Sequence, residues 1–236
     1  MRILLLATLA ACATTQPTPA APSAPVAAAA KPPKPERFEF KVRQDFFDGM
    51  RGDAAALDRA QKVCEDTLAK NPNHAEALVW HGAALTARAQ QAFAKGDRAK
   101  GMELYQQGTG EMDHAVELAP TDPGVRIPRG ALYLGMAHFV PQPEQTKIVK
   151  EGVEDYEVTL DVQKAFFKTL TLHSREQLLY GLTDGYAMLG NTDKARETYE
   201  RMRTDAPTSE LLTRAAERAA GHEVKGNTPC EQCHSR

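Results

Sequence analysis

The clearest pattern of apolar and polar positions lies between residues 176 and 209. Apolar residues recur there at three- and four-residue steps, stop at Gly190 and Asn191, and then resume until Pro207. The members of the series are Leu179, Leu182, Tyr186, Leu189, Ala195, Tyr199 and Met202. This spacing is typical of amphipathic helices, and a proline prevents a helix from continuing. We predict two helices joined by a tight turn, packed closely at the small Ala195.

Similar spacing extends over the preceding part of the chain. A first helical pair is expected at 40–71, and a second unit at 75–120. The second unit is longer than the final one, and its excess at 94–110 contains several glycines, so we predict elongated helices with an irregular join. A third unit follows Asp122 and Pro123, and Pro128 inside it predicts that the regular helix begins only there.

The partner helix of the third unit is expected at 144–172, with Phe166 and Phe167 among its apolar members. Ser174 followed by Gln177 three residues later is a capping-box pattern and predicts the start of the final unit. A terminal helix at 209–220 carries an apolar stripe of Leu212, Ala216 and Ala219 opposite charged residues, and Gly221 predicts its end. We therefore expect an all-α domain over 37–220, built as a short solenoid of helical hairpins.

The order Leu, Leu, Tyr, Gly, Ala, Tyr, Pro between Leu179 and Pro207 resembles the tetratricopeptide (TPR) repeat. The other units match that pattern less completely. The resemblance implies stacked helical hairpins with a groove that binds protein or peptide partners.

Composition agrees with a protein-binding role and argues against nucleic acid. The 236 residues contain 29 lysines and arginines against 31 aspartates and glutamates, so there is no basic field to attract a phosphate backbone. The 42% of hydrophobic residues suffices for one sizeable core or the distributed core of a solenoid.

The first 36 residues are expected to comprise a signal peptide followed by a linker. Met1 and Arg2 precede a short apolar run, and Leu9-Ala10-Ala11-Cys12 follows. This junction resembles a bacterial lipoprotein signal, which implies removal of residues 1–11, acylation of Cys12, and an outer-membrane lipoprotein facing the periplasm. The alternative is an ordinary secretory signal with a chance cysteine. Residues 12–36 are rich in alanine and proline, so we expect a disordered linker.

The C-terminal tail, 221–236, contains the residues with the strongest signal for a cofactor or metal site. Cys230, Cys233 and His234 stand in the order C-x-x-C-H, the attachment signature of c-type haem. By resemblance to c-type cytochromes, the two thiols would form thioethers and His234 would be the proximal iron ligand. The alternatives are a Cys230–Cys233 disulfide and a zinc or copper site. The candidates for a sixth iron ligand are His222, Met136, Met188 and Met202.

The remaining cysteine, tryptophan and histidine side chains are expected to have structural rather than functional roles. Cys64 occupies an apolar helical position and is expected to be a buried thiol, and Trp80 is expected to pack in the core. The other histidines are dispersed, with no paired ligand spacing, and we expect them to be surface or hydrogen-bonded residues: His74, His81, His114, His138 and His173. No glycine loop for phosphate, nucleophile elbow or catalytic carboxylate pair is present, so we expect no enzyme activity.

Two functions fit these features. The first is a lipid-anchored periplasmic TPR scaffold that binds protein partners and carries one covalent haem on its tail, as an electron-transfer accessory. The second is a TPR adaptor for envelope assembly or cytochrome maturation, without haem, whose tail holds a disulfide or a metal.

Overall fold

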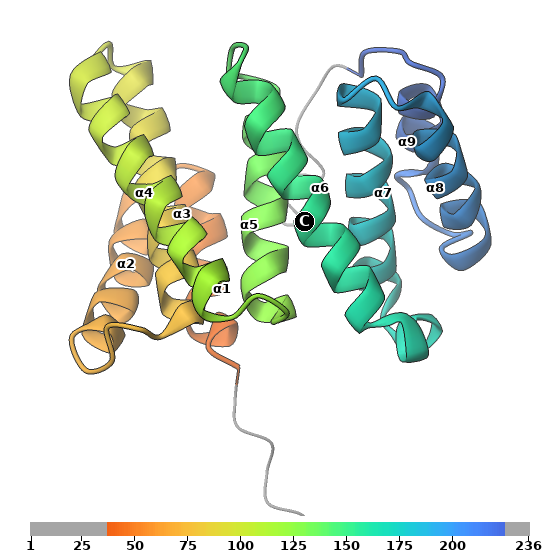
Figure 1. Cartoon of the computed structure of the whole chain (residues 1–236). Helices are drawn as coiled ribbons and strands as arrows, with labels where there is room; N and C mark the ends of the chain where they lie inside the picture. Colours follow the sequence, from red (N-terminus) through yellow and green to blue (C-terminus); the bar gives the residue numbers. More distant parts are fainter. Residues whose placement is uncertain (1–36, 225–236) are drawn as a thin grey trace, which may run out of the picture. The chain divides into compact units, whose positions relative to one another are not determined.

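The computed structural model describes residues 37–224, and every regular element among them is a helix (Figure 1). The elements are α1 (Glu39–Met50), α2 (Ala54–Leu68), α3 (Ala75–Ala94), α4 (Arg98–Leu118), α5 (Pro123–Met136), α6 (Glu144–Val162), the 3-10 helix η1 (Lys164–Thr169), α7 (Leu172–Met188), α8 (Thr192–Asp205) and α9 (Leu212–Ala219). The prediction of an all-α fold is confirmed.

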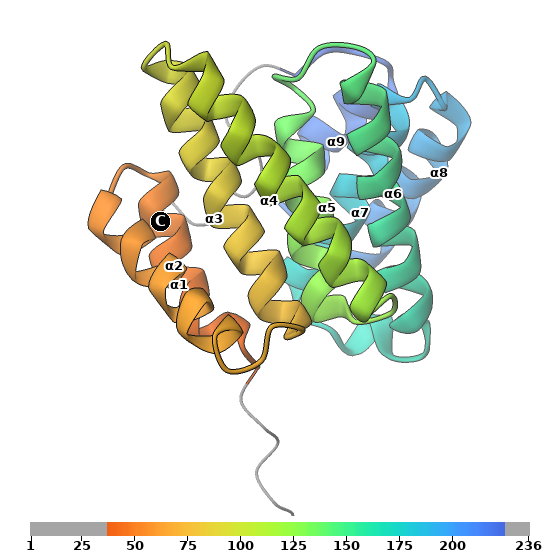
Figure 2. The same ribbon diagram turned by 60° about the vertical axis from the view of Figure 1, so that its left-hand side comes forward.

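Successive helices pack as hairpins, α1 with α2, α3 with α4, α5 with α6, and α7 with α8. The first helix of each new hairpin contacts both helices of the hairpin before it: α3 contacts α1 and α2, α5 contacts α3 and α4, and α7 contacts α5 and α6. Helix α9 continues the pattern against α7 and α8. The hairpins follow one another in chain order in both views (Figure 2). The described residues therefore form a stack of helical hairpins, in which neighbouring units supply each other's core.

The turns within the second and fourth hairpins share one local arrangement. Gly96 and Gly190 adopt positive φ angles of 84° and 71°, which reverse the chain after a helix and which L-residues with a side chain rarely adopt. The next residue then caps the following helix: the side chain of Asp97 accepts the N–H of Lys100, and that of Asn191 accepts the N–H of Lys194. A glycine followed by aspartate or asparagine thus ends one helix and begins the next.

The second hairpin is elongated as predicted, but its join is not irregular. Helices α3 and α4 have 20 and 21 residues, and only three residues lie between them. Gly82 and Gly108 are packing positions: a Cβ on Gly82 would approach the carbonyl oxygen of Gly108 and would lie 2.8 Å from Cγ of Met112. The expectation of an irregular segment at 94–110 was wrong. From sequence alone, a glycine that permits two helices to approach closely cannot be distinguished from a glycine that breaks a helix.

Helix α5 begins at Pro123, and the expectation that it begins at Pro128 was wrong. The side chain of Asp122 accepts the N–H of Gly124 at 2.8 Å and caps the first turn. Val125 and Arg126 are buried in that turn. The burial of this turn and its cap offset the single helical hydrogen bond that Pro128 removes.

The start of the final hairpin also differs from the prediction. Helix α7 begins at Leu172, and the hydroxyl of Thr171 accepts the N–H of Ser174 at 3.2 Å. The capping box of Ser174 and Gln177 is therefore wrong, because Thr171 offers the same chemistry three residues earlier.

The predicted partner helix at 144–172 is shorter than expected. Helix α6 ends at Val162, and η1 follows as a separate 3-10 segment. In that segment Phe167 is buried, with the guanidinium of Arg201 4.7 Å from its ring centroid, whereas Phe166 is 47% exposed. Only Phe167 of this segment packs into the core. The expectation that Phe166 and Phe167 both belong to an apolar helical stripe was wrong.

The core runs through all the hairpins. Trp80 is buried and packs edge-on against Phe46, with ring centroids 5.4 Å apart, so the prediction that it packs in the core is confirmed. Cys64 and Ala195 are also buried, as their positions on the apolar stripes predicted. The terminal helix α9 is shorter than predicted and buries Ala215, Arg218 and Ala219.

Candidate functional site

The residues with the strongest predicted chemistry lie outside the described part of the chain. These are the lipidation residue Cys12 and the haem-attachment residues Cys230, Cys233 and His234. Among residues 37–224, no helix has the length and apolar character that would let it cross a membrane. What the structure adds is the environment of the candidate sixth ligands and of the helical surface on which partners would bind.

The three methionine candidates are embedded in packing to different degrees. Met202 is fully buried, and Met136 and Met188 are partly buried against the core. A thioether sulfur of Met202 could contact iron only if the final hairpin opened. The structure therefore disfavours Met202 as a ligand for any group carried on the tail.

His222 offers a more open donor. It follows Gly221, whose φ of 82° ends α9, and its side chain is 65% exposed. Its Nδ1 lies 2.6 Å from Oε2 of Glu217. A carboxylate accepts hydrogen bonds, so this contact places the proton of a neutral imidazole on Nδ1 and leaves the lone pair on Nε2. The ring is thus oriented in the way that carboxylates orient metal-binding histidines.

The backbone of His222 is tied to the core. Nη1 of Arg218 donates to the carbonyl oxygen of His222 at 3.2 Å. The same guanidinium donates through Nε to Asp184 of α7, and Nε2 of His138 lies 3.1 Å from the other carboxylate oxygen. Asp184 and Arg218 are buried, so this chain of contacts links the end of α9 to α7 and to His138, which follows the end of α5. His222 therefore combines an exposed ring with a carbonyl oxygen that is hydrogen-bonded to the buried Arg218.

A cleft lies where the end of α7 meets α6 and α8. It has a volume of about 430 Å³, and its lining residues are Thr146, Lys150, Val153, Glu157, Tyr186, Met188, Leu189, Asn191 and Lys194. Nζ of Lys194 lies 3.2 Å from Glu157 and 4.9 Å from the ring centroid of Tyr186, whose hydroxyl also donates to Glu157. Lys150 leaves the lining with an excess of positive charge. Val153, Tyr186, Met188 and Leu189 supply apolar atoms to the lining, and Lys150 and Lys194 supply its cations.

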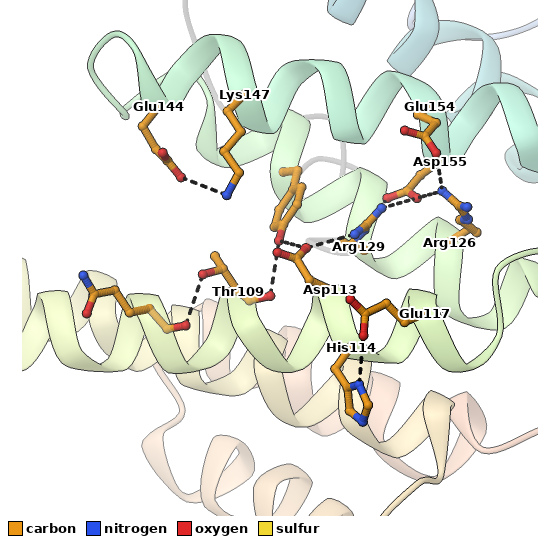
Figure 3. A network of polar contacts seen from close by, with 12 residues as sticks. Thr109, Asp113, His114, Glu117, Arg126, Arg129, Glu144, Lys147, Glu154 and Asp155 are labelled. Carbon is orange, nitrogen blue, oxygen red and sulfur yellow. Dashed lines mark hydrogen bonds and ion pairs between the residues drawn. The ribbon is translucent and has the colours of Figure 1, made fainter.

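A network of charged residues joins α4, α5 and α6 (Figure 3). The fully buried carboxylate of Asp155 accepts from Nη1 of Arg126 at 2.7 Å and from Nε and Nη2 of Arg129, both at 2.8 Å. Arg129 also donates to Asp113 at 2.9 Å, and Tyr133 donates to the same Asp113 oxygen at 2.7 Å. Burial raises the pKa of the Asp155 carboxyl, and the hydrogen bonds from the two arginines oppose that rise. Every charge in this network has a partner, which indicates a structural clamp.

Sequence reasoning missed this network, although a signal was present. Arg126 and Arg129 stand three residues apart on the same helical face as Tyr133, and Asp155 lies among the apolar positions of α6. Charged residues inside an apolar stripe are rarely buried unless they are paired. That the pairs cross from one helix to the next is visible only in the structure.

Two further groups are buried without forming a reactive centre. His81 lies between helices with Nδ1 2.5 Å from Glu111 and Nε2 3.8 Å from Glu65. Burial raises the pKa of the Cys64 thiol to about 12, so the thiol is neutral and unreactive at ordinary pH. Within the described residues, no three His, Cys, Asp or Glu side chains come together as a metal site.

Comparison with protein-family models, with curated proteins and with solved structures finds no match to this chain. The class that the fold defines is an all-α stack of helical hairpins. Of the four candidates for a sixth iron ligand, His222 is exposed, Met136 and Met188 are partly buried, and Met202 is fully buried. When bound, a c-type haem would supply one-electron redox chemistry.

Proposed function

We propose that the chain is an outer-membrane-anchored periplasmic scaffold of TPR-like hairpins that binds protein partners and carries one covalent c-type haem on its tail. The observation that carries the proposal is that one sequence contains two motifs for covalent modification. Cys12 stands at a lipoprotein junction, and Cys230, Cys233 and His234 form a haem-attachment signature that is loaded in the same compartment. Enzyme activity is not part of the proposal.

The haem is tested by producing the full-length protein together with the haem-maturation machinery. Intact mass should increase by one haem per chain, and the Soret band should survive denaturation because the thioether bonds are covalent. Replacing both Cys230 and Cys233 with serine should abolish the adduct, whereas Cys64→Ser, at a buried thiol, should not. A wild-type mass without haem, with a disulfide or a bound metal instead, would favour the second function, a non-haem adaptor.

The anchor is tested by fractionation. Cys12→Ser should leave the protein unprocessed or soluble in the periplasm, because no thiol remains to receive the lipid. The variant Cys64→Ser is again the matched control and should remain in the outer-membrane fraction. A Cys12→Ser protein that still fractionates with outer membranes would show that the lipoprotein assignment is wrong.

Partner binding is proposed at the cleft between α6, α7 and α8. Stacked hairpins present continuous surfaces for extended or helical peptides, and Lys150 and Lys194 favour acidic ones. A photo-crosslinking residue at Lys150 should capture a defined partner in cells, and the same residue at Lys62, an exposed lysine of the first hairpin, should not. Equal capture from both positions would contradict this location.

A further inference from the structure

The segment that joins α6 to α7 combines exposed apolar side chains with cations. It contains η1, in which the buried Phe167 packs into the core while Phe166 is 47% exposed. Val162, at the end of α6, is 42% exposed. Lys164 and Lys168 stand on either side of Phe166 in the sequence, and both are exposed. An aromatic side chain is thus presented to solvent between two lysines.

The same segment has an excess of positive charge. Residues 162–175 contain no aspartate or glutamate, although acidic residues slightly outnumber lysines and arginines in the whole chain. Nη1 of Arg175 donates to the carbonyl oxygens of Lys168 and Leu170, at 2.9 and 2.6 Å. Neither Lys164, Lys168 nor Arg175 pairs with a carboxylate in the part of the chain that the structure describes. Such a cluster of cations favours an anionic partner.

A second cluster of the same kind lies at the start of α1. Phe40 is 54% exposed, and the guanidinium of the exposed Arg43 lies 5.5 Å from its ring centroid. Lys41 is exposed beside it. Because successive helices alternate in direction, the start of α1 and the end of α6 lie at the same end of the stack, the lower end in Figures 1 and 2. That end therefore presents two exposed phenylalanines, Phe40 and Phe166, each beside cations.

From this arrangement we infer that this end of the stack contacts an anionic phospholipid bilayer. Phe40 and Phe166 would enter the headgroup region, and the lysines and arginines beside them would meet lipid phosphates. A bilayer is broad and flat, so it can reach both clusters at once, although one lies in the first hairpin and the other follows the third. A short acidic peptide would have to bridge them. The contact is made by residues of the helical domain, so it does not depend on lipidation of Cys12.

Co-sedimentation of the full-length protein with vesicles tests this contact. The vesicles contain phosphatidylcholine with or without phosphatidylglycerol, and the wild type should bind more tightly when phosphatidylglycerol is present and less tightly as salt is added. Replacing both Lys164 and Lys168 with glutamine should weaken binding by about 10–30-fold. Phe166→Ser should weaken it by about tenfold, because one aromatic side chain no longer buries its apolar surface. Residues 1–36 are identical in every variant, so differences in binding report on the cluster.

Two matched controls remove the same chemistry elsewhere. Replacing Lys62 and Lys147 with glutamine removes two exposed lysines that pair with Asp66 and Glu144, and it should leave binding close to that of the wild type. Phe139→Ser removes a phenylalanine that is 77% exposed after the end of α5, at the opposite end of the stack, and it should have no effect. Circular dichroism checks that each variant keeps its helical fold.

Tryptophan fluorescence tests which end of the stack meets the lipid. Phe166→Trp adds a tryptophan to the buried Trp80, and its emission should shift to shorter wavelength and be quenched by phosphatidylglycerol vesicles with brominated acyl chains. Phe93→Trp is the control, because Phe93 is 40% exposed near Lys95 and Arg98 but lies at the opposite end. Its added tryptophan should show neither change.

The outcomes separate this contact from its alternatives. Weaker binding of the two cluster variants, with unchanged controls and quenching at position 166, supports it. Equal loss in the controls, or equal quenching at position 93, would overturn the assignment to this end. Binding to polyglutamate in place of vesicles, or displacement from vesicles by inorganic phosphate at constant ionic strength, would show a different anionic ligand and also overturn it. A failure of lipidation at Cys12 would leave all these comparisons unchanged, so it is distinguished from a failure of this contact.

Discussion

Replacing Asp155 with asparagine should destabilise the fold strongly, because it removes a charge that two buried arginines require. Asp155 is fully buried, and it accepts three hydrogen bonds from Arg126 and Arg129, which are themselves only about 6% exposed. Asparagine has nearly the same shape, so the change tests the charge and the hydrogen bonds rather than the volume.

The magnitude follows from the geometry of the site. Asparagine keeps one oxygen, which can still accept from Nη1 of Arg126 and Nη2 of Arg129. Its amide group, however, faces Nε–H of Arg129, so two donors meet where a carboxylate oxygen accepted at 2.8 Å. Breaking a buried ion pair costs about 3–5 kcal/mol, and the retained oxygen places this variant near about 3 kcal/mol.

Urea unfolding followed by far-ultraviolet circular dichroism measures the loss. For a slope of about 2 kcal/mol per molar urea, the midpoint should fall by about 1.5 M. Hydrogen exchange should accelerate first in α5 and α6, the helices that the ion pairs join. The matched control is Glu154→Gln, on the same helix and facing the same Arg126 at 3.4 Å but 62% exposed. An exposed pair contributes at most about 1 kcal/mol, so this variant should remain close to the wild type.

Two results would refute the reasoning. A midpoint for Asp155→Asn within the range of the Glu154→Gln control would mean that the buried network contributes no more than a surface pair. A uniform rise in exchange along all hairpins would mean that the ion pairs do not stabilise α5 and α6 in particular.

Three further predictions concern the core. Gly181→Ala should cost about 1–3 kcal/mol in urea unfolding, because its Cβ would lie 2.7 Å from Cδ2 of the buried Tyr156 ring. Gly110→Ala, with nothing within 4 Å of its Cβ, is the control and should be neutral or stabilising; equal effects would contradict the close approach. Ala195→Leu should cost a similar amount, about 1–3 kcal/mol, and should raise hydrogen exchange in α7, α8 and α9 before α3; simultaneous loss everywhere would argue against a modular stack. Burial raises the pKa of Cys64 to about 12. An unfolded cysteine has a pKa of about 8.5, so the stability that depends on the neutral thiol is complete below that pH and is lost as the pH rises toward 12. The free energy of unfolding should therefore decline less above that pH in Cys64→Ala than in the wild type, and identical slopes would show that the thiol is not the titrating group.

The hairpins were accessible from sequence because their determinants are local. Gly190 and Asn191 lie next to each other in the chain, and together they end α7 and begin α8. The apolar stripe of the final hairpin also needs only the 3.6-residue period to be recognised. Two of the predictions that failed concerned helix starts, at Pro128 and Ser174, where packing or a neighbouring cap decided between two local choices.

For the candidate site, too, some features could be recognised from sequence and others only from the structure. A lipoprotein junction and a haem-attachment signature are contiguous in sequence, because the enzymes that modify them read a short segment. The sequence named His222 only as one of four possible ligands. The structure shows that the ring of His222 is exposed beside Glu217, whereas Met202 is fully buried.

By itself, the sequence determined the helical class, the number of hairpins, the elongation of the second one, and the motifs on which the proposed anchor and haem depend. These properties follow from periodicity and from residues a few positions apart. Only the tertiary structure decided that Gly82 meets Gly108, and that Asp155 of α6 pairs with Arg126 and Arg129 of α5. The physical reason is that side chains more than 20 positions apart become neighbours only when helices stack. Whether a charge is buried with a partner, or a glycine faces another backbone, is then a property of that stacking and has no local signature.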